Sequence, residues 1–198
     1  MQINAVVGGV EANLAKIKEG LNQVKQHNPD IVVFPELCLP GYPPEDLLFK
    51  PSFIQSCEEA LNDLTAFSLN IKAVLVVGTV VKTEAGLGNV AAVLYQGQKI
   101  AQYFKVFLPN YGVFDEKRYF VPGQEALVLK VGNYNVGVSV CEDIWYAEGP
   151  PAVAAVKGNA QLSININASP YHLNKGQQRE NLLITRAKDN LMAVAYVN

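Results

Sequence analysis

The sequence has few of the residues that most often carry enzyme chemistry at neutral pH. Among its 198 residues are two histidines, His27 and His172, and three cysteines, Cys38, Cys57 and Cys141. Because histidine is the usual general base near neutral pH, an enzyme built from this chain needs another base. The odd number of cysteines and their wide spacing argue against a disulfide framework and a zinc centre, and they fit a reducing, cytoplasmic location.

Charge and long hydrophobic runs are also scarce. Charged residues make up 17% of the chain, the formal net charge is −2, and no cluster of lysine and arginine stands out. We therefore expect no nucleic-acid partner. No apolar stretch reaches the length of a membrane span, and the first residues lack the pattern of a signal peptide, so we expect no membrane association. The hydrophobic share of 49% is enough for a substantial core with strands covered on both faces.

Strand-like and helix-like segments alternate along the chain, which predicts an α/β fold in layers. Residues 13–26 carry apolar side chains at helical spacing, and Ser52 is a candidate N-cap for a second helix. Residues 86–89, Gly-Leu-Gly-Asn, indicate a turn within an antiparallel section. The other predicted strands cover residues 31–34, 73–81, 90–95, 100–104, 127–131, 136–140, 162–166 and 191–197, and the other predicted helices cover residues 151–157 and 177–190.

Three reactive residues stand just beyond the ends of three predicted strands: Glu36, Lys105 and Cys141. Taken singly, each has an ordinary explanation. The glutamate could be a solvated charge, the lysine a surface residue whose stem covers apolar neighbours, and the cysteine a small packing residue. Since the carboxyl ends of parallel strands meet at one edge of a sheet, the three together predict a common active site.

The chemistry of these three side chains is complementary. A cysteine attacks an amide carbon as its thiolate, so Cys141 needs a base, and Glu36 is suited to take the thiol proton. Lys105 and the backbone N–H of Glu142 are suited to stabilise the oxyanion that forms in such an attack. A dyad of Cys141 and His172 is the alternative, but it leaves the glutamate and the lysine without a role.

The residues around these side chains resemble a known family. Three motifs are similar to the active-site motifs of the nitrilase superfamily of carbon-nitrogen hydrolases: Phe34-Pro35-Glu36, Lys105 with Leu108-Pro109-Asn110-Tyr111, and Cys141-Glu142-Asp143-Ile144-Trp145. Within that superfamily, residues 35–47, 111–120 and 167–171 resemble the branch formed by the glutaminase domains of glutamine-dependent NAD(+) synthetases. The resemblance spans nearly the whole chain.

The resemblance implies an α-β-β-α sandwich and a set of site residues. It implies that Glu36, Lys105 and Cys141 form the catalytic triad and that Glu116 is a second carboxylate that helps to hold the lysine. It also implies that four residues bind the substrate, namely Tyr111, Glu142, Ser169 and Lys175. Cys38 and Cys57 match no catalytic position of the family, and we interpret both as packing residues.

The same resemblance implies hydrolysis of L-glutamine to glutamate and ammonia through a cysteine thioester. The ammonia would serve a synthetase domain that amidates deamido-NAD(+) to NAD(+) with ATP and magnesium, while this chain itself needs no cofactor or metal. Two alternatives remain open at this stage. One is a stand-alone nitrilase-type amidase or carbamoylase that acts on another small amide, and the other is a catalytically silent interaction module.

The two ends of the chain depart from the pattern of the family. The first β-strand of the glutaminase domain is cut short at Met1, an acidic residue is missing where Gly9 stands, and the strands that usually follow Asn198 are absent. We therefore expect residues 1–198 to be an incomplete carbon-nitrogen hydrolase domain, truncated at both ends and lacking the synthetase domain. Such a fragment should associate into a homo-oligomer and show weak activity by itself.

Overall fold

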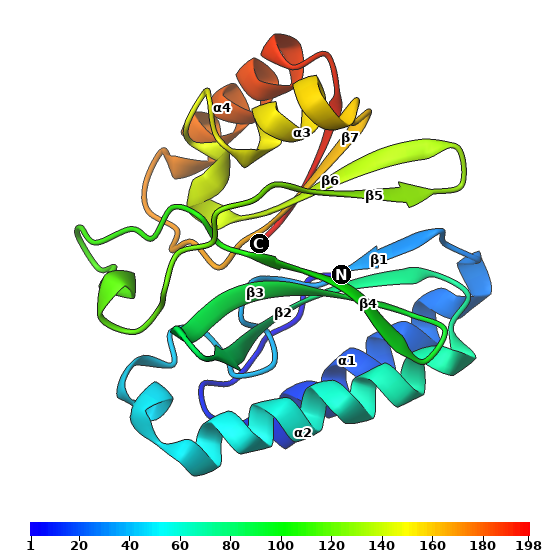
Figure 1. Ribbon diagram of the computed structural model, residues 1–198, viewed down its shortest axis with the longest axis vertical. Coiled ribbons are helices and arrows are strands. Elements are labelled where there is room, and N and C mark those ends of the chain that lie inside the picture. The colour runs from blue at the N-terminus through cyan, green and yellow to red at the C-terminus, as the bar shows by residue number, and fades with distance from the viewer.

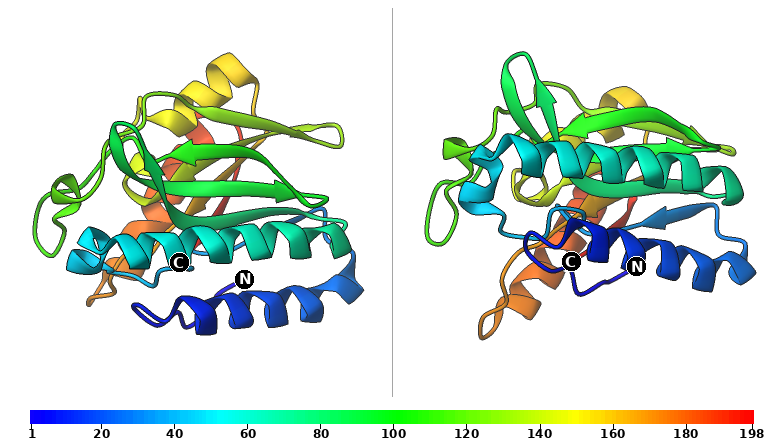
Figure 2. Two further views of the ribbon diagram at one scale, coloured as in Figure 1. Left: turned by 60° about the horizontal axis from the view of Figure 1, so that its bottom comes forward. Right: turned by 90° about the horizontal axis from the view of Figure 1, so that it is seen from below.

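A computed structural model describes residues 1–198 as four layers, in the order helices, sheet, sheet, helices (Figure 1). The two sheets have four strands each and pack face to face. Helices α1 (Val10–Val24) and α2 (Pro51–Phe67) lie side by side on the outer face of the first sheet (Figure 2). Helices α3 (Pro150–Gly158) and α4 (Lys175–Asp189) cover the second sheet. This arrangement confirms the predicted α-β-β-α sandwich.

The first sheet, here called sheet A, contains β1 (Ile31–Val33), β2 (Val74–Thr83), β3 (Gly86–Tyr95) and β4 (Gln98–Phe104), in that order. Strand β1 is parallel to β2, and β2, β3 and β4 form an antiparallel meander, as predicted. Strands β1 and β4 therefore run in the same direction. Their carboxyl ends lie at the same edge of the sheet, which places the residues that follow them on that edge.

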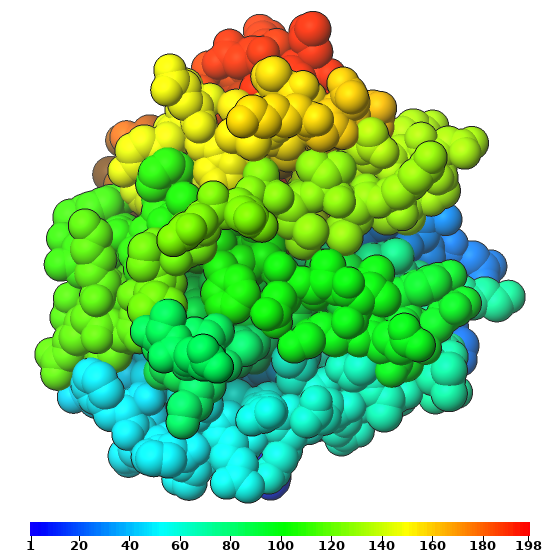
Figure 3. Space-filling model, viewed as in Figure 1, coloured from blue at the N-terminus to red at the C-terminus, as the bar shows by residue number.

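The second sheet, sheet B, contains β5 (Leu127–Val131), β6 (Tyr134–Val140), β7 (Leu162–Ile166) and β8 (Ala193–Val197). Strands β6, β7 and β8 are mutually parallel, and β5 is antiparallel to β6. Tyr103 of sheet A and Val138 of sheet B belong to one buried cluster between the sheets. Figure 3 shows the face of the molecule on which β4 lies. A cavity of about 380 Å³ is lined there by the end of β4, residues 102–104, and by the segment 123–127 that leads into β5.

Two local predictions about sheet A and its helices are wrong. The segment Gly86 to Asn89 is the start of β3, and the turn lies at residues 84–85. Gly88 serves a close approach: a Cβ there would lie 2.4 Å from the ring of Phe104 on the neighbouring strand. Ser52 is not an N-cap, because α2 already begins at Pro51, whose missing N–H suits the first position of a helix.

The largest core lies between sheet A and its two helices and contains 23 buried residues. The spacing of apolar residues along α1 puts Ile17 and Leu21 on the face toward the sheet, where both are fully buried. The helices over sheet B bury fewer residues, and Arg186 is the one buried residue of α4. No helix of the structure has the combination of length and apolar composition needed to cross a bilayer.

Candidate active site

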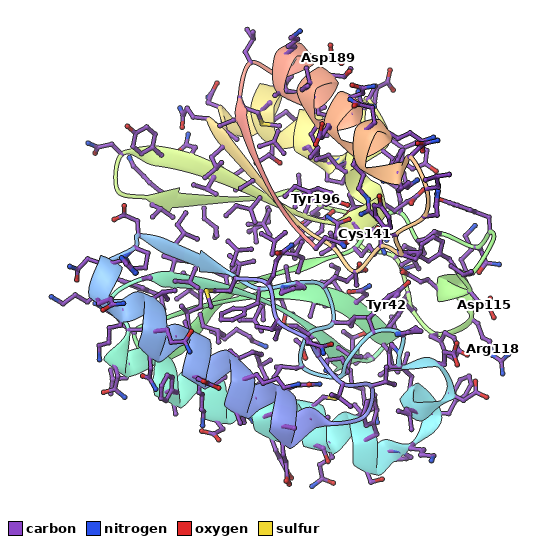
Figure 4. The ribbon with its side chains drawn as sticks, turned by 180° about the vertical axis from the view of Figure 1, so that it is seen from behind. Tyr42, Asp115, Arg118, Cys141, Asp189 and Tyr196 are labelled. Atoms are coloured by element: carbon purple, nitrogen blue, oxygen red, sulfur yellow. The ribbon has the colours of Figure 1, made fainter.

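The structure brings Glu36, Lys105 and Cys141 together where the two sheets meet. Glu36 and Lys105 follow β1 and β4 of sheet A, and Cys141 follows β6 of sheet B. Their side chains are almost completely buried, with exposed fractions of 1%, 0% and 2%. In the side-chain view Cys141 lies at the boundary between the layers, near Tyr42 of the opposite layer (Figure 4). The Lys105 Nζ lies 2.8 Å from the Glu36 carboxylate. Cys141 is linked to this pair through the segment of Ala168 and Ser169, because Ala168 donates to Glu36 and Ser169 lies beside the sulfur.

A network of short hydrogen bonds fixes the charged groups of sheet A. The Lys105 Nζ donates to Oε1 of Glu36 and to Oε1 of Glu116, each at 2.8 Å. The Asn89 Nδ2 donates to the same Glu36 oxygen at 2.7 Å, and the backbone N–H of Ala168 donates to Glu36 Oε2 at 3.0 Å. Both oxygens of Glu36 are therefore held in place, one from sheet A and one from sheet B.

This network contains one cation and two carboxylates, and the imbalance shifts its titration. Burial by itself lowers the pKa of Lys105, but the ionised forms of Cys141, Glu36 and Glu116 outweigh burial and raise the pKa well above the ordinary value. Burial, followed by repulsion from Glu36, raises the pKa of Glu116 to about 7. The lysine therefore stays charged, whereas Glu116 takes up a proton near neutral pH. The second oxygen of Glu116 is buried and has no hydrogen-bond partner.

Cys141 occupies a strained turn at the end of β6. Its φ angle of +48° lies in the left-handed region, where a residue with a side chain costs on the order of 1–3 kcal/mol. A short 3₁₀ turn, Cys141–Ile144, follows directly. Burial, and then the charge of Glu36, raise the pKa of the thiol, while Lys105 opposes that rise. The resting residue is therefore a protonated thiol, which has to lose its proton to a base before it can attack.

The predicted substrate-binding residues border the thiol. The Ser169 Oγ lies 3.4 Å from the Cys141 Sγ. The Tyr111 hydroxyl donates to both carboxylate oxygens of Glu142 at 2.9 Å, and burial together with that carboxylate raises the pKa of Tyr111 to about 12. Lys175 starts α4 with its Nζ 4.4 Å from the centre of the Trp145 ring. Ser169 thus lies beside the sulfur, Tyr111 and Glu142 meet at the turn that Cys141 opens, and Lys175 lies over Trp145 at the end of that turn. These four residues are here called the rim.

Three cavities border this cluster from different sides. The first, of about 310 Å³, is lined by Tyr42 and Glu116, and the second, of about 640 Å³, by Tyr111 and Glu142. The third, of about 210 Å³, is lined by Glu36 and by residues of the segment 167–169. The buried thiol itself lines none of the three cavities.

The other cysteines and histidines lie outside the cluster. Cys38 donates to the carbonyl of Gly78 at 3.4 Å, and Cys57 packs in the core on α2, which fits their interpretation as packing residues. His172 is exposed, and its Nδ1 lies 3.1 Å from the carbonyl oxygen of the next residue, Leu173. A dyad of Cys141 and His172 has no geometric support.

Sequence reasoning missed several residues that hold the site together. The contact of Asn89 with Glu36 could not be found from the sequence because the segment of Asn89 was interpreted as a turn. Asp143 lies within the predicted motif but was given no role, although its carboxylate accepts four hydrogen bonds. The Arg179 Nη2 donates to the carbonyl of Ser169 at 3.0 Å, and the Asn198 Oδ1 accepts from the N–H of Ser169 at 2.8 Å. These last contacts have no local sequence signal.

A buried Glu–Lys pair beside a strand-end cysteine, within a four-layer sandwich, defines a class of carbon–nitrogen bond hydrolases. The family described as "Carbon-nitrogen hydrolase" matches residues 1–198, and the chain belongs to it. It is therefore an enzyme of the nitrilase superfamily, as the motifs predicted.

Relatives narrow the comparison further. The chain is 45% identical over its whole length to a glutamine-dependent NAD(+) synthetase from Aquifex aeolicus, but spans 34% of that protein. The solved structure of glutamine-dependent NAD(+) synthetase from Acinetobacter baumannii superposes with a TM-score of 0.93 at 37% identity, covering 100% of this chain and 37% of that one. The chain thus spans about a third of these relatives and matches their glutaminase domain.

An amidase is also similar. A structure of a glutamate-to-glutamine mutant of the amidase from Nesterenkonia sp. AN1 has a TM-score of 0.89 at 27% identity and covers 100% of this chain and 76% of that chain. In that structure acrylamide has added to the active site cysteine.

Proposed function

We propose that this chain hydrolyses the side-chain amide of L-glutamine to L-glutamate and ammonia. The observation that carries the proposal is the meeting of a protonated cysteine, in a strained turn, with a buried Lys105–Glu36 pair that touches the segment of Ser169. The similarity to synthetases that use glutamine supports the choice of amide.

In the first half of the reaction, Glu36 accepts the proton of the Cys141 thiol as the sulfur attacks the amide carbon. The carbonyl oxygen becomes an oxyanion, which the Lys105 ammonium and the backbone N–H of Glu142 stabilise. The C–N bond then breaks, Glu36 returns the proton to the leaving nitrogen, and ammonia departs. A thioester between the sulfur and the glutamyl carbon remains.

In the second half, water attacks the thioester carbon while Glu36 takes one of its protons. The C–S bond breaks, the sulfur recovers that proton as a thiol, and glutamate leaves. The hydrogen bonds from Asn89 and Ala168 keep the Glu36 carboxylate in one orientation through both halves. Lys105 donates to Glu116 as well as to Glu36, so its positive charge is shared between two carboxylates.

The rim residues are suited to the amino-acid end of glutamine. The buried carboxylate of Glu142, oriented by Tyr111, offers a partner for an α-ammonium group. Lys175, held over Trp145, offers a partner for an α-carboxylate. Ser169 is close enough to the sulfur to donate to the reacting amide. These contacts would fix the distance from the α-ammonium and α-carboxylate groups of the substrate to the Cys141 sulfur. The site would therefore select an amide side chain of matching length.

In a longer protein like the relatives, we propose that the ammonia serves a synthetase domain. That domain would bind ATP and magnesium and amidate deamido-NAD(+) to NAD(+). The similar Nesterenkonia amidase supports a second candidate, a stand-alone amidase that acts on a small amide without charged ends. The two candidates differ in whether the rim charges of Glu142 and Lys175 matter for the substrate.

Release of ammonia from a panel of amides tests the proposal. We expect this chain to prefer L-glutamine over L-asparagine and over butyramide, and Glu142→Gln to weaken this preference. Preference for butyramide would favour the amidase candidate, and release from no amide would argue for a silent module. If a synthetase domain accompanies this chain, as in the relatives, Cys141→Ala should abolish glutamine-dependent synthesis of NAD(+) and leave synthesis with free ammonia intact.

A further inference from the structure

The active site is divided between the two sheets, and something must fix the spacing between its halves. Lys105 and Glu36 belong to sheet A, whereas Cys141 belongs to sheet B. Apolar side chains fill most of the interface between the sheets. Such packing is not directional, so it does not by itself define the distance between a lysine and a sulfur to a fraction of an ångström.

Apart from the side-chain contact of Tyr111 with Glu142, two groups of hydrogen bonds cross from one sheet to the other beside the triad. One joins Glu36 to the segment after β7. The N–H of Ala168 donates to the Glu36 carboxylate at 3.0 Å, and the N–H of Glu36 donates to the carbonyl of Asn167 at 3.2 Å. The other is made by Asp143, in the turn that Cys141 opens. The first group orients the base, and the second connects the nucleophile to the lysine segment.

The Asp143 carboxylate contacts both sides of the divide. Its Oδ1 accepts from the backbone N–H groups of Val106 at 3.1 Å and Phe107 at 2.8 Å, the two residues that follow Lys105. Its Oδ2 accepts from the N–H of Val140 at 3.1 Å, the residue before Cys141, and from the hydroxyl of Tyr103 at 2.7 Å. One carboxylate thus touches the neighbours of the nucleophile and of the lysine.

We propose that Asp143 is a positioning residue that sets the spacing between the Cys141 sulfur and the Lys105 ammonium. The inference rests on the proposed function only in taking Cys141 as the nucleophile. Asp143 does not touch the reacting atoms, and it acts by holding two backbone segments against one another. A misplacement of about 1 Å at such a site can cost on the order of 10²-fold in rate.

The chemistry of the contacts requires a carboxylate. Asp143 is fully buried, and its two oxygens meet four donors. An asparagine presents one oxygen and one NH₂ group. In place of Oδ1 the NH₂ group would face two backbone N–H groups, and in place of Oδ2 it would face the N–H of Val140, although the Tyr103 hydroxyl could turn and accept from it. Burial raises the pKa of Asp143 to about 6, with the N–H of Phe107 and the hydroxyl of Tyr103 opposing that rise. The group therefore remains ionised at neutral pH.

A second buried charge serves as a comparison within the same turn. Arg186 of α4 donates to the carbonyl oxygens of Ile144 and Trp145, each at 2.9 Å. Both contacts stay within the sheet B half of the molecule. Loss of Arg186 should loosen the turn against its own layer, whereas loss of Asp143 should release it from the Lys105 segment.

The test compares Asp143→Asn with Arg186→Gln by the rate at which acrylamide alkylates Cys141, read by mass spectrometry of its peptide. Alkylation needs a correctly placed thiolate and no glutamine. For Asp143→Asn we expect a fall on the order of 10²-fold in alkylation rate and in kcat, with KM nearly unchanged. For Arg186→Gln we expect a lowered Tm and an alkylation rate within a few-fold of the wild type. Cys38 and Cys57 act as internal monitors, because general loosening would speed their alkylation.

Several results would overturn the inference. They are an unchanged alkylation rate in folded Asp143→Asn, an equal fall in Arg186→Gln, and a parallel rise at Cys38 and Cys57. If Asp143→Asn does not fold, Tyr103→Phe removes one of the four donors and should slow alkylation by about three- to tenfold. An unchanged rate in that variant would also overturn it. If Cys141 alkylation depends on Asp143 but no glutamine is hydrolysed, the positioning role stands and the proposed substrate fails.

Discussion

The two halves of the molecule contribute to the site in different ways. Sheet A brings the charges, Glu36, Lys105 and Glu116, and holds them through side chains that bond directly to one another. Sheet B brings the nucleophile and holds it through the backbone, in a strained turn beside the segment of Ser169. In sheet A the charged groups hold one another in place by ion pairs, whereas in sheet B the backbone conformation of the turn holds the sulfur.

The apolar packing between sheet and helices is also more extensive in the sheet A half than in the sheet B half. The core between sheet A and its helices has 23 buried residues, whereas the cluster that contains Ala154, Ala160 and Met192, outside sheet B, has three. Preorganised charges stabilise a transition state only if they do not relax, so the half that carries them needs the firmer support. We infer that changes among the sheet A charges alter stability and rate together. Changes at the sheet B thiol should alter the rate alone.

The largest expected effect is on the sheet A side. In Lys105→Met two buried carboxylates lose their cation, which should destabilise the fold by about 3–5 kcal/mol at neutral pH. Amide hydrolysis should fall by at least about 10³-fold because the oxyanion loses its charged partner. Lys18→Met is the matched control, since its pair with Asp63 is partly exposed and such pairs are worth at most about 1 kcal/mol. Urea unfolding and ammonia release measure both quantities. A Lys105→Met protein as stable as wild type would break the comparison.

The surplus of negative charge in sheet A gives a pH dependence. The pKa of Glu116 is raised from 4.5 to about 7 by burial and by Glu36. Between these values the unfolded chain releases a proton that the folded chain keeps, so stability falls as pH rises through this window. Glu116→Gln should remove that fall and be more stable than wild type at pH 8 by on the order of 2 kcal/mol.

The control for this prediction is Glu58→Gln, an exposed change on α2. Asp143, whose pKa is raised to about 6, gives a slope of the same sign at lower pH, and that slope should remain in Glu116→Gln. Thermal melts from pH 5 to pH 8 separate the two contributions. Parallel curves for Glu116→Gln and wild type would show that Glu116 titrates normally.

On the sheet B side, a change should remove activity without loss of stability. Cys141→Ala and Cys141→Gly both lack the thiol, and both should be inactive. The φ of +48° suits glycine, so Cys141→Gly should be more stable than Cys141→Ala by about 1 kcal/mol. Urea unfolding of the two variants gives the difference directly. If the alanine variant is the more stable, the turn is not strained by its side chain.

The strand-end positions of Glu36, Lys105 and Cys141 could be read from the sequence because each follows an apolar run along the chain. Asn89 could not be found in that way. The glycines around it indicate a turn locally, but Gly88 is required by the ring of Phe104 on the next strand, and Gly86 has a φ of +141° and lies close to Val121. Tertiary contact decided this case against local propensity.

The hydrogen bonds that orient the site were beyond sequence reasoning for a different reason. Ala168 donates to Glu36 across 132 positions of the chain, and Asp143 reaches Phe107 across 36. A backbone N–H is present in every residue except proline, so neither donor leaves a mark on the sequence. The motif therefore identified Asp143 as a neighbour of the nucleophile, and only the packing of the two sheets gave its carboxylate partners.

The smallest expected effect is at the rim, where the two halves meet again. Tyr111 comes from the loop after β4, and its hydroxyl donates to both oxygens of Glu142 in the sheet B turn. Tyr111→Phe removes that donation and leaves the Glu142 carboxylate less oriented toward an α-ammonium group. One such hydrogen bond is worth about 1 kcal/mol, so KM for glutamine should rise roughly fivefold with little change in kcat. Butyramide has no α-ammonium group and serves as the control substrate, whose KM should not change. A fall in kcat for both substrates would instead assign Tyr111 to the chemical step and join the rim to the charge network of sheet A.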